Sequence, residues 1–341
     1  MKNNFRMLLL LALALFALAL GVALGSVGIS AADLLAILGH KLFGRALPEE
    51  IPGVTVSILW TIRFPRAVMA FLVGASLAAS GTVMQSVLRN PLASSYTLGV
   101  SSGASLCAAL VIVTGFALPL IGRYTLPLFG FLGGLGTVFL AMALAMRFDR
   151  NLENQTVILV GMVLSLFVNA LLTLVTALSS DRLSQLVYWQ MGSFSGQSWE
   201  NCALVLPILL VSLGVLLRYS REMDLMTFGE EQALSAGVDL RRVKFLLIAV
   251  SALLTGTAVS LAGVIGFVDL IAPHVVRRFF GSSHRRVVPM SALFGGAFMV
   301  LADLAGRTVL APQELPVGAV TALIGAPFFA YIYFRRGRSG S

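Results

Sequence analysis

Two acidic residues, Asp269 and Asp303, lie inside apolar segments, where an ionisable group is costly to bury and is often functional. Asp303 has a base four residues further on, Arg307, which shares its face of a helix and could neutralise it. For Asp303 an internal ion pair and a role in transport are equally open. Asp269 has no base close to it in the sequence, so a protonated carboxyl, a cavity-facing carboxylate and a contact with another helix all stay open.

The chain has no residues arranged for ATP hydrolysis. None of its three lysines follows a glycine, so the G-K-[ST] core of a phosphate-binding loop is absent. The other candidate ligands are scattered and predict neither a metal site nor a thiolate site: His40, His274, His284, Cys107 and Cys202. We therefore expect no catalytic residue, metal or cofactor, and any pumping must draw its energy from a partner or an ion gradient.

The composition predicts the environment in which these residues work. The chain is 58% hydrophobic and 11% charged, with a mean hydropathy of +0.93, whereas soluble domains carry about 25% charged residues. This pattern is typical of an all-α, polytopic membrane protein. The net charge of +9 does not indicate nucleic-acid binding, because the Lys and Arg residues gather at the ends of apolar runs, as membrane topology requires.

Apolar runs divide the chain into about ten transmembrane helices within a single domain over residues 1–341. The expected spans are Met7–Leu24, Ala67–Leu88, Tyr96–Phe116, Leu126–Met146, Val157–Leu178, Cys202–Leu217, Phe245–Ala262, Val264–Phe280, Val287–Leu310 and Pro316–Phe334. Ten spans place both termini on one side of the membrane. If that side is the cytoplasm, 17 Lys and Arg residues lie inside and seven outside, which is the bias that multi-pass proteins show.

The most charged segment is Arg218–Lys244, with ten charged residues in 27 positions between two apolar runs. The charge bias makes it cytoplasmic. Glu230 and Glu231 suit the first turn of a short helix, where the helix dipole favours acids. Gly237 is placed to end that helix in the left-handed conformation.

This short helix also has apolar side chains to offer: Leu225, Met226, Phe228, Ala233 and Leu234. A loop in solvent does not need them unless something covers them. One interpretation is a helix folded back on its own protein, and the other is a docking helix for a soluble partner. The whole stretch is expected to lie in water.

Several motifs resemble the FecCD family of ABC importer permeases. They are RFPR (Arg63–Arg66), GASLAASGTVMQSVLRNPLASSYTLGVSSGAS (Gly74–Ser105), GEEQALSAG (Gly229–Gly237), GVIGFVDLIAPHVVR (Gly263–Arg277), ADLAGR (Ala302–Arg307) and ELPVGAVTALIGAPFF (Glu314–Phe329). They cover nearly the whole chain in the family's order. Asp269 departs from the pattern, because the family usually has glycine there.

The resemblance implies a ten-helix permease subunit in the cytoplasmic membrane that imports an iron-siderophore, haem or cobalamin. It implies a second permease copy, in a homodimer or a heterodimer, two cytoplasmic ABC ATPase subunits and an extracytoplasmic substrate-binding protein. By resemblance, the helix at Gly229–Gly237 enters a groove of the ATPase, through Phe228, Gly229, Glu230, Glu231, Ala233, Leu234 and Gly237. Also by resemblance, Arg63, Arg66 and Arg307 receive acidic residues of the binding protein.

The sequence also allows a second interpretation of the arginines and of the whole protein. The three outer arginines could instead anchor helix ends or pair within the chain. For the whole protein, the alternative function is a secondary transporter that uses Asp269 or Asp303 to carry protons. An intramembrane enzyme is a third class, for which the chain offers no catalytic set.

Overall fold

The computed structural model describes residues 2–25, 29–149 and 152–337, and this part of the chain is helical without a strand. Its longer helices are α1 (Lys2–Ala23), α2 (Ala31–Phe43), α4 (Phe64–Val87), α5 (Val100–Thr114), α6 (Thr125–Phe148), α7 (Asn154–Ala177), α9 (Trp199–Arg218), α12 (Leu240–Ala262), α13 (Val268–Phe280), α14 (His284–Thr308) and α15 (Val317–Gly337). The shorter ones are α3 (Gly53–Ser57), α8 (Leu183–Met191), α10 (Ser220–Phe228) and α11 (Glu230–Ser235).

Each of the ten expected spans coincides with one helix. Within the described residues, seven helical segments are long and apolar enough to cross a membrane, and α5 and part of α15 are shorter apolar helices. The remaining span is α13, which has only 13 residues and carries charged residues at both ends. The prediction of an all-α, polytopic membrane protein is confirmed.

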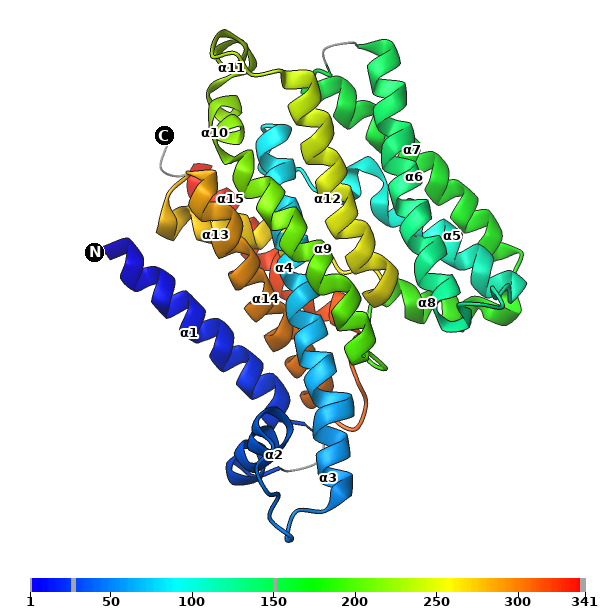
Figure 1. Cartoon of the computed structure of the whole chain (residues 1–341). Helices are drawn as coiled ribbons and strands as arrows, with labels where there is room; N and C mark the ends of the chain where they lie inside the picture. Colours follow the sequence, from blue (N-terminus) through cyan, green and yellow to red (C-terminus); the bar gives the residue numbers. More distant parts are fainter. Residues whose placement is uncertain (1, 26–28, 150–151, 338–341) are drawn as a thin grey trace.

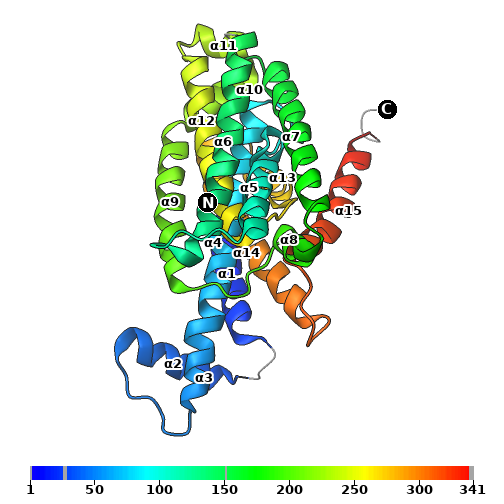
Figure 2. The ribbon, with the colours of Figure 1, turned by 90° about the vertical axis from the view of Figure 1, so that its right-hand side faces the viewer.

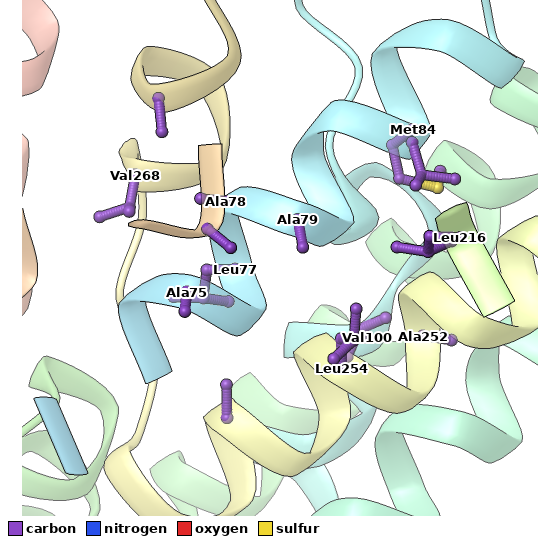
Figure 3. Packing of buried hydrophobic residues seen from close by; sticks show 14 of the residues in the cluster. Ala75, Leu77, Ala78, Ala79, Met84, Val100, Leu216, Ala252, Leu254 and Val268 are labelled. Atoms are coloured by element: carbon purple, nitrogen blue, oxygen red, sulfur yellow. The ribbon is translucent and has the colours of Figure 1, made fainter. Parts of the chain in front are cut away.

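Helix α4 is the centre of the molecule. It continues an irregular helical segment that starts at Gly53, and nearly all of its residues are buried. Figure 3 shows its small side chains Ala75, Ala78 and Ala79 among apolar residues of neighbouring helices. Small residues let membrane helices approach closely, and the backbone contacts of α4 are tight. A Cβ atom at Gly74 would lie 2.3 Å from the carbonyl oxygen of Gly295 on α14.

The two ends of the bundle differ. Helices α10 and α11 lie at one end and α2 and α3 at the opposite end (Figure 1). Helix α1 runs beside α14, and Arg6 near its start donates to the carbonyl oxygen of Phe279 at 2.6 Å. Its far end meets Arg307, which donates to Leu24 O at 3.0 Å. Figure 2 shows α15 at one side of the bundle, where α8 contacts it.

Some segments between the expected spans contain helices. Residues 25–61 include α2 and α3, and residues 179–201 include α8. Two arginines counted for the inside, Arg150 and Arg338, lie outside the described residues.

Candidate coupling helix and outer arginine network

The charged segment Arg218–Lys244 contains two short helices before α12, rather than one. Gly229 separates α10 from α11 with φ of +145°, a conformation that favours glycine. Helix α11 starts at Glu230, so both glutamates lie in its first turn as predicted. Gly237 adopts φ of +83°, and Val238 N donates to Ala233 O at 3.0 Å beyond it. This is the left-handed stop that the sequence predicts.

The apolar residues of these two helices face in two directions. Met226 and Ala233 are buried in the main apolar core, so they hold the segment onto its own protein. Phe228 and Leu234 are 76% and 57% exposed. They border an open cavity between α11 and the start of α7. The segment is therefore both folded back on the protein and equipped with an uncovered apolar face.

A buried lysine fixes the position of α11. Lys244 on α12 is 1% exposed, and its Nζ lies 2.8 Å from the Glu230 carboxylate. The same Nζ donates to the carbonyl oxygen of Leu152 at 2.8 Å. A buried charge needs such partners. The expectation that all of Arg218–Lys244 lies in water is wrong at this residue, because α12 begins at Leu240 and carries Lys244 into the protein.

A second link joins α10 to the membrane helices. Asp224 on α10 accepts hydrogen bonds from the backbone N and the ring Nδ1 of His284, at 2.9 and 2.6 Å. With Nδ1 donating, Nε2 is left to accept from the hydroxyl of Ser86 on α4, at 2.7 Å. No local sequence pattern indicates these contacts, because Asp224 and Ser86 lie far from His284 in the chain.

At the opposite end of the bundle, Arg66 lies between two acids. Its Nη2 is 2.9 Å from Asp303 Oδ1, and its Nη1 is 2.8 Å from Glu314 Oε1. Both contacts are paired with a second hydrogen bond, the fork geometry that makes arginine–carboxylate pairs strong. The hydrogen bond from Arg66 lowers the pKa of Glu314, which lies in the loop between α14 and α15.

The other two outer arginines hold the end of α1. Arg63 is buried and donates to the carbonyl oxygens of Val22 and Ala23, at 3.4 and 2.9 Å. Arg307 donates to Gly21 O and Leu24 O, and its Nε lies 3.4 Å from Asp303 Oδ2. The last carbonyl groups of a helix lack partners within it, so these arginines supply them. The structure thus places all three predicted docking arginines at one end, with contacts inside the chain.

Asp303 and Asp269 have different surroundings. The expected Asp303–Arg307 pair is present, and Arg66 is a further base on Asp303 that sequence spacing did not indicate. Asp269 is buried, and its carboxylate accepts a hydrogen bond from the Ser94 hydroxyl. The carboxylate thus contacts the segment between α4 and α5, at the residue that precedes the helical turn Ser95–Leu98. No group of three or more His, Cys, Asp or Glu side chains in the described ranges is placed to hold a metal ion.

The sequence profile of the FecCD transport family matches residues 10–335. This chain belongs to the FecCD family. The cobalamin import permease BtuC of Halobacterium salinarum is 42% identical over 290 residues, which are 85% of this chain and 77% of that protein. The hemin transport permease HmuU of Yersinia pestis is 37% identical over 281 residues, covering 82% of this chain and 84% of that one.

A solved structure of an ABC transporter also has the same fold. An ABC transporter assigned to the metal-chelate type, in an inward-facing conformation, superimposes with a TM-score of 0.84 at 30% identity. The match covers 97% of this chain and 99% of that one. This FecCD-family chain is thus a multi-pass permease subunit of an ABC importer. The family assignment decides between the two transporter classes and sets aside the proton-driven alternative.

Proposed function

We propose that this permease carries an iron-siderophore, haem or cobalamin across the cytoplasmic membrane, driven by separate ABC ATPase subunits and fed by an extracytoplasmic binding protein. The main support is the uncovered apolar face formed by Phe228, at the end of α10, and Leu234 on α11. An exposed apolar face on an anchored helix is the kind of surface that a partner covers. The charge bias of the sequence places that face in the cytoplasm, where ATP is available.

The anchoring of α11 suits it to transmit force. Ala233 packs in the core, Glu230 is tied to buried Lys244, and Gly237 ends the helix. A helix that couples an ATPase to the membrane helices must be held rigidly, because a flexible loop would not transmit the movement of the ATPase. We propose that Phe228–Gly237 is the coupling segment, with Phe228 and Leu234 as the residues that enter the ATPase.

The outer arginines are proposed to receive acidic residues of the binding protein. Arg66 is the best placed of the three, since its side chain keeps 12% exposure and its partner Glu314 is exposed. Arg63 and Arg307 lie beside it and add positive potential, which attracts an acidic partner over several ångströms. An exchange of Glu314 for a carboxylate of the binding protein would leave the Asp303 contact of Arg66 in place.

A second permease copy is part of the proposal. The translocation path would lie between two copies, in a homodimer or a pseudo-symmetric heterodimer. The ligand class rests on the relatives, which carry cobalamin and hemin in their names. Thermal-shift screening of the cognate binding protein against iron-siderophores, haem and cobalamin tests this part, and binding of none of the three would contradict it.

The energy source tests the proposal as a whole. The permease is reconstituted in proteoliposomes with its ATPase and binding protein, and uptake of the ligand found in that screen is measured. Uptake should require enclosed ATP on the ATPase side and survive a proton uncoupler. Uptake that continues without ATP and stops with the uncoupler would overturn the proposal.

A further inference from the structure

His284 occupies a junction between three helices. It is the first residue of α14, it is 1% exposed, and both of its ring nitrogens have a partner. Asp224 of α10 accepts from the backbone N–H and Nδ1–H of His284, and from the hydroxyl of Ser283 at 3.3 Å. Asp224 thus caps the start of α14 from another helix, supplying an acceptor that the first turn lacks.

The far side of the ring reaches a third helix. Nε2 of His284 bonds the hydroxyl of Ser86, which lies in the last turn of α4. Helices α10 and α11 contact each other, and both bury residues in the main apolar cluster: Met223 and Met226 from α10 and Ala233 from α11. The imidazole therefore connects the coupling segment to the inner ends of both α4 and α14.

Helices α4 and α14 are in close backbone contact. Gly74 and Gly295 bring their backbones together, so that a Cβ at Gly295 would lie 2.6 Å from Gly74 O. Gly296 lies against the ring of Phe71, where a Cβ would approach to 2.6 Å. Packed helices of this kind shift as rigid units rather than deform. At their other end the same two helices are joined by the Arg66–Asp303 pair.

We propose that His284 is a positioning residue that passes the movement of α10–α11 to the joined pair α4–α14, and through it to the outer arginine network. This inference rests on the proposed function, because it presupposes an ATPase at α11 and a binding protein at the far end. It adds the internal connection between those two surfaces. The residues of that connection are Asp224, His284 and Ser86.

The test uses the assembled complex of the permease with its ATPase and binding protein. Mg-ATP hydrolysis is measured with and without the binding protein, and the ratio is the coupling signal. In Asp224→Asn and His284→Asn, assembly and basal hydrolysis should stay within about twofold of wild type, while the ratio falls about fivefold or more, the scale of typical coupling between sites. The matched control is Arg285→Ala, an exposed neighbour on the same turn.

A cross-link between α10 and α14 distinguishes a loss of coupling from a folding defect. In a background with Cys107→Ser and Cys202→Ser, Asp224→Cys with Ser283→Cys removes the carboxylate and should lower the ratio. Joining the two thiols with dibromobimane restores the tie between α10 and α14 and should restore the ratio. A folding defect would not recover after assembly, and the double variant Asp224→Asn, His284→Asn should be no worse than either single one.

Each outcome bears on the inference. Variants that assemble and keep the wild-type ratio overturn it, as does a ratio that falls only in proportion to the amount of assembled complex. If the cross-link fails to raise the ratio, the connection does not run through this contact. If ATP hydrolysis by the wild-type complex does not change when the binding protein is added, the proposed function fails, and this inference fails with it. If the wild-type complex responds and the variants respond equally, only this inference fails.

Discussion

Arg66 joins α4 to α14 and to the loop before α15, at the end of the bundle opposite α10 and α11. It bonds Asp303 with one edge of its guanidinium and Glu314 with the other. Asp303 is 3% exposed, so it holds the arginine in place, while Glu314 is the exposed and replaceable partner. This division explains how one side chain can belong to an internal pair and still be proposed for docking.

Replacing Arg66 tests the docking proposal. We expect Arg66→Gln to weaken capture of the loaded binding protein about tenfold or more, because it removes a charged partner of an acidic residue. Assembly with the ATPase should be unchanged. Affinity is measured by surface capture at low salt, where exposed charges count most.

The matched control is Arg123→Gln, at an exposed arginine outside this network that pairs with Glu200. It should bind as wild type does. If Arg66→Gln also binds like wild type at low salt, the arginine serves only the internal network.

Gly81 shows how little room the interior leaves for a side chain. A Cβ there would lie 2.0 Å from the carbonyl oxygen of Asp269, so α4 and the start of α13 are in backbone contact. We expect Gly81→Leu to destabilise the protein by about 1–3 kcal/mol, the usual cost of overpacking. The readout is the thermal midpoint of the purified protein in detergent.

Gly136→Leu on α6 is the comparison, because nothing lies within 4 Å of a Cβ at that position. Its thermal midpoint should match that of wild type. Equal midpoints for both variants would mean that α4 and α13 do not pack as closely as described.

At the scale of the element, α11 is a short helix with two different faces. Ala233 lies in the core, whereas Leu234, the next residue, is 57% exposed. Because α11 has only six residues, its position depends on its anchors, Lys244 and the turn at Gly237. Loss of its outer face should therefore uncouple the transporter without unfolding it.

We expect Phe228→Ala and Leu234→Asp to lower copurification with the ATPase and binding-protein-stimulated ATP hydrolysis about tenfold, since truncating a buried interface contact costs a few kcal/mol. Gly237→Val should act in the same way, because valine is strained at φ of +83°. The amount of permease in the membrane should not change. Ser235→Ala, on the same helix and exposed, is the control.

Wild-type copurification and ATP hydrolysis in all three variants would show that α11 is only a loop folded back on its own protein. The ATPase contact would then have to lie elsewhere, and the basic segment Arg277–Arg286 would be the next surface to test.

At the scale of the whole molecule, charged residues from distant helices contact one another at the two ends of the bundle. The carbonyl oxygen of Phe279 binds Arg6, and Asp224 binds His284, at the end that carries α10 and α11. Arg63, Arg66 and Arg307 gather at the other end, beside α2 and α3. This arrangement agrees with ten spans, and the charge bias predicts that the end with α10 and α11 faces the cytoplasm.

Cysteine labelling tests the orientation. In the background without Cys107 and Cys202, tags at Ser235 and Ser282 should react with an impermeant thiol reagent only from the cytoplasmic side. Tags at Gly53 and Ser195 should react only from outside. All four positions are exposed, so that failure to label reports sidedness rather than burial. Labelling of Ser282 from outside would contradict the ten-span topology.

The sequence alone determined the class, the spans and the short helix α11, because these depend on local patterns. A run of apolar residues predicts a membrane helix wherever it packs, and Glu230, Glu231 and Gly237 mark the two ends of α11 through interactions within a few residues. The long family motifs determined the importer class in the same way. The same local reasoning found the pair Asp303–Arg307, whose members are four residues apart.

Only the tertiary structure decided which charged residues meet across the bundle. Arg66 pairs with Glu314, Asp224 with His284, and Asp269 meets Ser94, across 248, 60 and 175 residues of sequence. The hydrophobic periodicity of one helix does not predict such pairs, because they form only when distant helices pack together. Packing also decided that Lys244 is buried while Phe228 is not. Burial in a bundle depends on which neighbour covers a helix face, and that neighbour can lie anywhere in the chain.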